Sequence, residues 1–287
     1  MTFKGKIYEV GESNKLSIIV LTENIKRIIT LNYIEKVKSL RINVRLILVE
    51  DKGSEFSFAK SWNAGISQFY KNPTMYVAFS HDDVIFNDNT VEKIIELLEI
   101  HRDIDVGVPI IRENGIDNLS ILLKIMPDQF YTYSKIGSHI PILLFPLIEP
   151  FRNFIIKRFF QSKENELDFG SPINKISEGY IIRLLPFCIL RESILSKIGP
   201  FDENYYFGED IDYTYRLYLS DAKCSVISDS SIVHLGSYSI GKRESKPLLE
   251  KYAHLKRELT AYNITFKKYA KMKEILYDKA KQNTVIL

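Results

Sequence analysis

The chain has 287 residues, of which 45% are hydrophobic and 26% are charged, an ordinary composition for a globular protein with a sizeable core. Its 39 basic and 36 acidic residues give a net charge of +3, which is too balanced to suggest a nucleic-acid-binding protein. The two cysteines, Cys188 and Cys224, stand among apolar neighbours without a CxxC pair, so we expect neither a disulfide framework nor a zinc site.

The sequence predicts a protein that does not span a membrane. No apolar run follows residues 1–6, so we expect no signal peptide. The most apolar stretch, residues 140–151, is broken by prolines and a glutamate and is shorter than the about 20 apolar residues that a membrane helix needs. We therefore expect an intracellular, cytoplasmic protein.

Strands and helices alternate along the first 111 residues. Apolar runs predict buried strands, and apolar positions at helical spacing predict helices between them. The strands are expected at 16–22, 44–49 and 75–79, and the helices at 25–40, 57–70 and 90–98. This order predicts a parallel sheet with right-handed crossovers, in which ligands bind at the carboxyl ends of the strands.

Polar residues follow all three predicted strands at that edge. Thr22 ends the first strand, Asp51 follows the second, and the run His81-Asp82-Asp83 follows the third. Because the carboxyl ends of parallel strands share one edge of the sheet, we expect these residues to line one ligand site.

A second acidic group is formed by Glu209, Asp210 and Asp212, just after Gly208. Transfer of a group from a phosphate-activated donor needs one acidic group to hold a metal and another to accept a proton. The two acidic groups together therefore indicate an enzyme. The alternative is a helix N-terminus, where carboxylates interact favourably with the helix dipole, and Asp212 has an expected ion-pair partner one turn later in Arg216.

The alternation stops between residues 112 and 180, which we interpret as an insertion. Phenylalanines at helical spacing within 151–160, with basic residues between them, are typical of a helix lying on an anionic membrane or of one covering the core. Peripheral membrane contact therefore stays open. Regular structure is expected again at 181–191 and onward to 233, and residues 242–283 have the pattern of a helical tail.

A series of motifs in chain order resembles the family 2 glycosyltransferases with the GT-A fold. The resemblance covers roughly residues 16–111 and 181–240. The first two strand ends match LSIIVLTEN (16–24) and VEDKGS (49–54). The A-x-x-R-N-x-G-I helix matches AKSWNAGI (59–66), and the DxD-type metal motif matches SHDDV (80–84). The acceptor-side block of the family matches CILR (188–191), GPFDE (199–203) and GEDID (208–212).

The resemblance implies an α/β fold of the GT-A type, with a Rossmann-like, mostly parallel central sheet flanked by helices, an insertion and a C-terminal helical tail. It implies a glycosyltransferase domain at 1–241 and a C-terminal helical extension at 242–287. Within the domain, residues 1–111 would bind the donor nucleotide, 112–180 would form the insertion, and 181–241 would form the acceptor and catalytic half.

The implied activity is that of an inverting, metal-dependent glycosyltransferase of the hexosyltransferase type. It would move a sugar from a nucleotide-sugar donor to a hydroxyl of a sugar, lipid-linked or protein-linked acceptor, in glycan, polysaccharide or glycolipid synthesis. Asp83 would hold the divalent metal, and His234 is a second candidate ligand. Manganese is favoured over magnesium because imidazole nitrogen suits the later first-row metals, although magnesium stays open.

The resemblance also assigns the remaining site residues. Asp210 would be the general base, with Glu209 as its competitor. Thr22, Asp51 and Asp82 would contact the donor nucleotide. Each of these assignments has a structural alternative, such as a turn former at a strand end or a histidine that only packs.

Four positions depart from the family pattern. Lys52 replaces an acidic residue that often contacts the base, so the base stays open, and Trp62 replaces an arginine. His81 opens the metal motif where an aspartate is common, and Leu21 replaces a proline. The donor sugar, the acceptor and the oligomeric state are likewise not defined by the sequence.

Two other functions compete with this one. A nucleotidyltransferase would need a glycine-rich, lysine-bearing phosphate loop after the first strand, and residues 22–26 contain no glycine. A catalytically silent relative that only binds a sugar or nucleotide would not need both Asp83 and Asp210, and the chain has both.

Overall fold

The computed structural model describes residues 3–52, 57–87, 89–113, 122–124, 180–205, 208–236 and 248–287. Most of the insertion expected at 112–180, including the helix expected within 151–160, lies outside these ranges, so both stay predictions. Within the described residues, none of the helices combines the length and the apolar character needed to cross a membrane.

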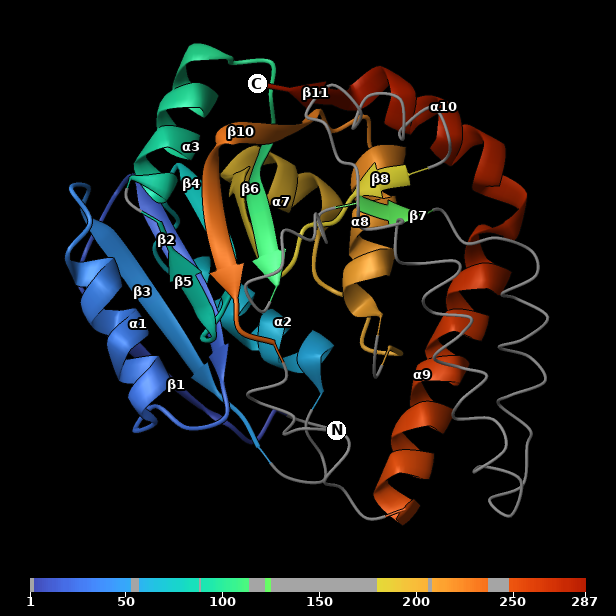
Figure 1. Ribbon diagram of the computed structural model, residues 1–287, viewed down its shortest axis with the longest axis horizontal. Helices are drawn as coiled ribbons and strands as arrows, with labels where there is room; N and C mark the ends of the chain where they lie inside the picture. The colour runs from blue at the N-terminus through green and yellow to red at the C-terminus, as the bar shows by residue number, and fades with distance from the viewer. Residues whose placement is uncertain are drawn as a thin grey trace.

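A mixed sheet occupies the centre of the molecule (Figure 1) and contains nine strands within the described residues. The strand order is β1-β3-β2-β4-β9-β6-β10-β11, and β5 pairs with β10 off this path. The strands are β1 (Lys6–Val10), β2 (Leu16–Thr22), β3 (Val44–Glu50), β4 (Tyr76–His81), β5 (Val84–Phe86), β6 (Val106–Glu113), β9 (Phe187–Arg191), β10 (Cys224–His234) and β11 (Thr284–Ile286). A separate antiparallel pair is formed by β7 (Leu122–Lys124) and β8 (Tyr180–Ile182).

The mostly parallel α/β fold expected from the sequence is confirmed. Strand β2 pairs in parallel with both β3 and β4, and β10 pairs in parallel with β6 and β11. The sheet is mixed because β9 runs antiparallel between β4 and β6, and because β1 and β5 are antiparallel to their neighbours. Parallel orientation places the carboxyl ends of β2, β3, β4, β6 and β10 at one edge.

Helices pack on this sheet as the alternating pattern predicts. The first three are α1 (Ile28–Lys38), α2 (Phe58–Phe69) and α3 (Thr90–Ile100), and the later ones are α7 (Glu192–Ile198), α8 (Glu209–Leu219), α9 (Leu248–Tyr269) and α10 (Lys273–Asn283). Helix α2 lies directly on β2 and β3, and Gly65 allows this close approach. A Cβ atom at Gly65 would lie only 2.4 Å from Cγ2 of Ile19.

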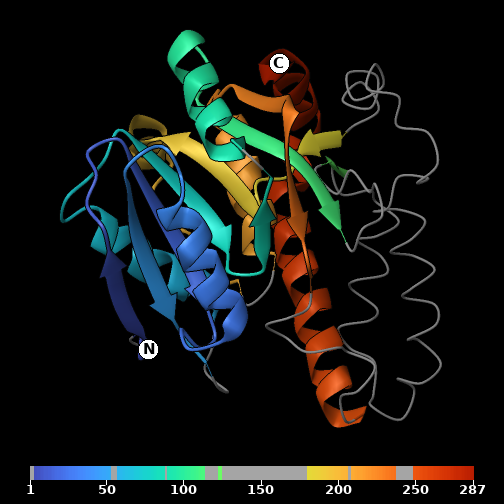
Figure 2. The same cartoon turned by 60° about the vertical axis from the view of Figure 1, so that its left-hand side comes forward.

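The C-terminal segment is helical as expected and ends in a strand. Helix α9 extends along the molecule (Figure 2), and a short 3₁₀ turn, Ala270–Met272, joins it to α10. Strand β11 then pairs in parallel with β10, and the amide of Ser228 donates to the Leu287 carbonyl over 2.7 Å. The last residues of the chain therefore extend the central sheet.

A buried charge network joins α8 to α9. Asp212 is 0% exposed and accepts hydrogen bonds from Arg216 Nε (2.9 Å), Lys268 Nζ (2.7 Å) and the Tyr269 hydroxyl (2.7 Å). The ion pair expected between Asp212 and Arg216 is thus present. Lys268 also pairs with Asp202 over 3.0 Å, so one lysine of α9 connects the segments GPFDE (199–203) and GEDID (208–212).

We expect Asp212→Asn to lower the free energy of unfolding by about 1–3 kcal/mol, because it weakens charge-assisted hydrogen bonds to a buried carboxylate. The change leaves Lys268 and Arg216 beside a neutral amide that cannot balance their charges. Denaturant titration measures the difference. The control is Asp221→Asn, which removes an exposed pair with Lys279 and should cost about 0–1 kcal/mol. Equal losses in the two variants would contradict the importance of the network.

Candidate metal and catalytic site

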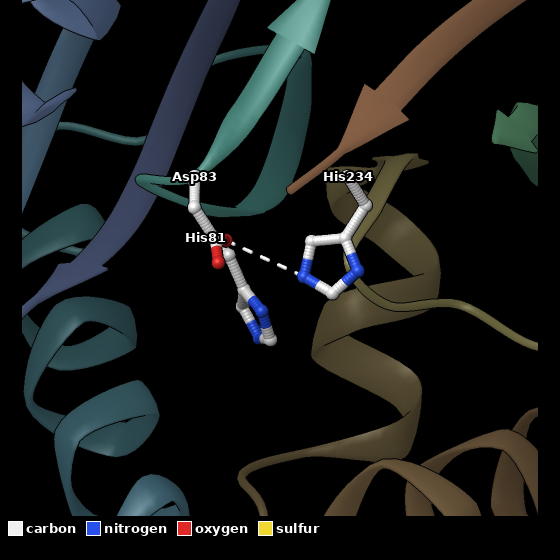
Figure 3. Close-up of side chains that lie close together, drawn as sticks. All are labelled: His81, Asp83 and His234. Atoms are coloured by element: carbon white, nitrogen blue, oxygen red, sulfur yellow. Dashed lines mark ion pairs between the residues drawn. The ribbon is translucent and has the colours of Figure 1, made fainter. Parts of the chain in front are cut away.

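Three candidate metal ligands meet at the carboxyl edge of the sheet (Figure 3). His81 ends β4, Asp83 lies in the turn between β4 and β5, and His234 ends β10. The antiparallel pairing of β5 with β10 sets His234 opposite Val84, directly beside Asp83 in sequence. The backbone fixes this arrangement further, because the amide of Leu235 donates to the carbonyl of Asp83 over 3.0 Å.

The geometry of these three residues suits one divalent cation. Their ligand atoms, one from each side chain, lie within 4.8 Å of one another. His234 Nε2 is 3.4 Å from Asp83 Oδ1, and Asp83 is 2% exposed. Two imidazole nitrogens and a carboxylate oxygen form a donor set that suits manganese, iron or zinc better than magnesium. We refer to His81, Asp83 and His234 as the metal triad.

The charges within the metal triad favour metal binding. Burial lowers the pKa of His81 to about 4, even though the charge of Asp83 opposes this shift. Burial alone would raise the pKa of Asp83, but its hydrogen bond with His234 and the two imidazoles outweigh burial and lower it. At neutral pH His81 is therefore a neutral imidazole and Asp83 a carboxylate, the forms that coordinate cations.

Aromatic rings hold His81 in place. Its ring stacks against Trp62 with the centroids 6.1 Å apart, and Trp62 stacks in turn on Phe201 at 6.0 Å. Phe201 stacks on Tyr213 at 4.1 Å. We call these four residues the aromatic column. Trp62 is thus an apolar support for a candidate metal ligand.

Asn63 fixes the column from α2. Its side-chain amide donates to the Phe201 carbonyl over 2.9 Å and accepts from the Phe201 amide over 2.7 Å. These two hydrogen bonds, one donated and one accepted, join the segment GPFDE (199–203) to the segment AKSWNAGI (59–66) of α2. Two of the recognised motifs therefore hold each other in register.

Asp82 is hydrogen-bonded to a pair of threonines. Its Oδ2 accepts hydrogen bonds from Thr22 Oγ1 (2.7 Å) and Thr30 Oγ1 (2.6 Å), and burial raises its pKa. The structure thus brings Thr22 and Asp82 together at the strand ends, as the sheet order predicts. Here they are hydrogen-bonded to each other and to α1, and their contact with a nucleotide stays a prediction.

Asp51 lies at the same edge, at the end of β3. Its Oδ2 accepts a hydrogen bond of 2.6 Å from Ser61 Oγ in α2, and its amide donates to the Thr22 carbonyl over 3.1 Å. The side chain is partly exposed, and the neighbouring Lys52 is exposed. The position fits the expected nucleotide contact, which also stays a prediction.

The second acidic group begins α8. Gly208, with φ +75°, is the N-cap residue of the helix, and Glu209 and Asp210 lie in its first turn. Glu209 is 5% exposed, and burial, followed by the charge of Asp210, raises its pKa well above the ordinary value. Asp210 accepts a hydrogen bond of 3.2 Å from Arg183 Nε, and its side chain is 13% exposed.

The charges at the start of α8 reach one residue of the metal triad. Burial is the main cause of the lowered pKa of His81, and the charges of Asp83, His234, Arg183 and Asp210 also act on it. That Asp210 and the metal triad serve one site stays a prediction. Sequence reasoning did not identify Arg183, whose only sequence signal is a single charge inside the apolar run IIRLLP at 181–186.

A pH experiment tests the burial of Glu209. The pKa of Glu209 is raised above its ordinary value of 4.5 only in the folded protein. Between pH 4.5 and the folded-state pKa, the unfolded chain therefore ionises this carboxyl group more readily than the folded protein does, and the stability of the fold falls as pH rises. We expect the melting temperature of Glu209→Gln, relative to the unmodified protein, to rise over this window. Glu274→Gln on the exposed side of α10 controls for losing one carboxyl group. A flat difference for Glu209→Gln would contradict the raised pKa.

Fold and site together define an α/β protein whose sheet carries a candidate metal and carboxylate centre at its carboxyl edge. No protein-family model matches the sequence, and no curated protein matches it.

Among solved structures, this chain is similar to S. aureus TarS. The crystal structure of TarS 1–349 matches with a TM-score of 0.44 and 17% sequence identity, over 84% of this chain and 65% of that chain. The same fragment in complex with UDP-GlcNAc gives 0.44 and 17%, over 85% and 65%. Its complex with UDP gives 0.41 and 16%, over 88% and 71%. The chain spans 37% of the longer TarS structure.

Proposed function

We propose that the chain is a metal-dependent, inverting glycosyltransferase that uses a nucleotide-sugar donor and a hydroxyl acceptor. The observation that carries this proposal is the metal triad at the carboxyl edge of the sheet, together with a carboxylate at the start of α8, Asp210, whose charge acts on His81. Sugar transfer from a diphosphate needs a cation for the leaving group and a base for the acceptor.

On the donor side, Asp83, His81 and His234 would hold a divalent cation. When bound, the cation stabilises the negative charge that the nucleoside diphosphate gains as it leaves. Thr22, Asp51 and Asp82 line the neighbouring strand ends and would contact the nucleotide.

On the acceptor side, Asp210 would accept the proton of the acceptor hydroxyl. The hydroxyl oxygen forms a bond to the anomeric carbon, while the bond between that carbon and the diphosphate oxygen breaks and its electron pair stays on the diphosphate. A single displacement of this kind inverts the anomeric configuration. Asp210 is a better candidate than Glu209, because Glu209 is almost completely buried and burial disfavours the ionised form that a base needs.

Two measurements test the proposal. Thermal shifts are recorded with UDP, GDP, ADP and CDP, each with and without manganese, and stabilisation that needs both nucleotide and metal is the expected result. Hydrolysis of the matching nucleotide-sugar then separates an enzyme from a silent relative, which would bind without turnover. Absence of any metal-dependent shift would overturn the proposal. Release of pyrophosphate from a nucleoside triphosphate and a sugar phosphate would favour the nucleotidyltransferase.

The choice of metal gives a further prediction. Because two of the three triad ligands are imidazoles, we expect manganese to support donor hydrolysis better than magnesium at equal concentration. His234→Ala should weaken this preference, since it removes one nitrogen ligand. Equal activity with the two metals, unchanged in His234→Ala, would mean that His234 only packs against Asp83.

A further inference from the structure

The aromatic column connects one residue of the metal triad to the helix that carries the second acidic group. The ring planes of His81 and Trp62 differ by 19°. Phe201 is nearly parallel to both of its neighbours, at 22° to Trp62 and 18° to Tyr213. Because His81 ends β4 and Tyr213 lies in α8, about one turn after Asp210, four stacked rings join the end of β4 to the start of α8.

The column is buried and is supported from the side by β4. Trp62 and Tyr213 are 0% exposed, and Phe201 is 3% exposed. Phe79 of β4 packs edge-on against all three rings, with centroid distances between 5.2 and 6.0 Å. Since protein interiors are close-packed, these rings cannot change their spacing without moving the elements that they join.

The end of the column in α8 is fixed by the residues that precede Phe201. The guanidinium carbon of Arg216 lies 4.9 Å from the centroid of the Tyr213 ring. This guanidinium also donates to the carbonyls of Ile198 and Pro200, over 3.0 and 2.9 Å. Helix α8 and the segment GPFDE (199–203) therefore hold the last ring of the column together.

We propose that the aromatic column sets the position of the candidate base in α8 relative to the metal triad, an inference that rests on the proposed function. Phe201 and Tyr213 are positioning residues in this role, because both are buried and act through the two ends of the column. Sugar transfer needs the attacking oxygen in line with the bond that breaks, and a misplacement of about 1 Å can cost about 100-fold in rate. The stacked rings act as a spacer of fixed thickness between the two halves of the site.

Phe201→Leu tests this role, because it removes a ring from the middle of the column and spares both ends. The backbone of Phe201 keeps its two hydrogen bonds with Asn63. Trp62 keeps its contacts with His81 and Phe79, so the support of the candidate metal ligand is retained.

The measured reaction is hydrolysis of the nucleotide-sugar whose base gives the largest thermal shift in the panel above, in manganese. Water takes the place of the acceptor hydroxyl and must lose a proton in the same way. We expect Phe201→Leu to lower kcat about 10- to 100-fold. KM, and the manganese affinity measured by calorimetry, should change little, because the column contacts neither the donor nor the metal directly.

The matched control is Phe69→Leu, the same change at a ring that is 0% exposed and ends α2, about two turns after Trp62. Phe69 packs edge-on against Tyr70, outside the column. The control should lower the free energy of unfolding, as the loss of buried side-chain volume does, and leave kcat unchanged. A second pair keeps the test decisive if Phe201→Leu does not fold: Tyr213→Phe keeps the stacked ring and should retain more turnover than Tyr213→Leu.

Equal losses of kcat in Phe201→Leu and Phe69→Leu, or an unchanged kcat in Phe201→Leu, would overturn the inference. A loss that saturating manganese restores would also overturn it, because the column would then only support His81. If the unmodified protein hydrolyses no nucleotide-sugar in manganese, the proposed function fails instead.

Discussion

Asp83→Ala is expected to abolish metal-dependent binding of a nucleoside diphosphate and to leave the fold intact. Asp83 supplies the carboxylate of the metal triad, and the other two ligands are imidazoles. Loss of an outer-shell partner of a metal ligand typically costs about 10–100-fold in metal affinity, so loss of the ligand itself should cost at least this much. The fold should persist, since the backbone carbonyl of Asp83 keeps its hydrogen bond from Leu235.

Calorimetry with manganese and the nucleoside diphosphate measures this loss, and circular dichroism checks the fold. The matched control is Asp103→Ala, which removes an exposed carboxylate paired with Lys223 on the surface. It should leave binding unchanged. Unchanged affinity in Asp83→Ala would remove Asp83 from the metal site.

Asp210→Asn is expected to bind donor normally and to lose turnover by about 10²–10⁴-fold, the usual contribution of a general base. The amide has nearly the same shape as the carboxylate but cannot accept the proton of the acceptor. Single-turnover transfer to an acceptor measures the chemical step, and calorimetry shows whether donor affinity is kept.

Glu209→Gln is the control for this experiment, because it changes the adjacent carboxyl group in the same way. If its burial keeps Glu209 protonated, the variant should lose little turnover. A loss below roughly tenfold in Asp210→Asn, together with a large loss in Glu209→Gln, would assign the base to Glu209.

The sequence predicted the parallel half of the sheet well. Strand β2 occupies the predicted 16–22, and β3 and β4 differ from prediction by one or two residues, because continuous apolar runs are typical of strands covered on both faces. Strand β1 was missed because it lies at the edge of the sheet and is only partly buried. The antiparallel direction of β9 could not be predicted, since a local pattern carries no information about strand direction.

The structure brings together side chains that the motifs mark, and it adds others that only contacts define. Asp83 and His234 were linked through the resemblance, and the β5–β10 pairing brings them within 3.4 Å. Thr30 and Arg183 belong to no motif, and their roles depend on side chains from distant segments. Asp82 was predicted as a ligand contact from its motif, but the motif could not show that its carboxylate is hydrogen-bonded to two threonines.

The aromatic column gives the protein an optical reporter at its candidate metal site. Trp62 is the only tryptophan in the chain, is 0% exposed, and stacks directly on His81. Its emission, excited at wavelengths where tyrosine absorbs little, therefore arises from one ring in contact with a metal-triad residue. Paramagnetic manganese bound there would quench this emission, whereas diamagnetic magnesium would not. Occupancy of the centre can thus be followed by fluorescence without a label.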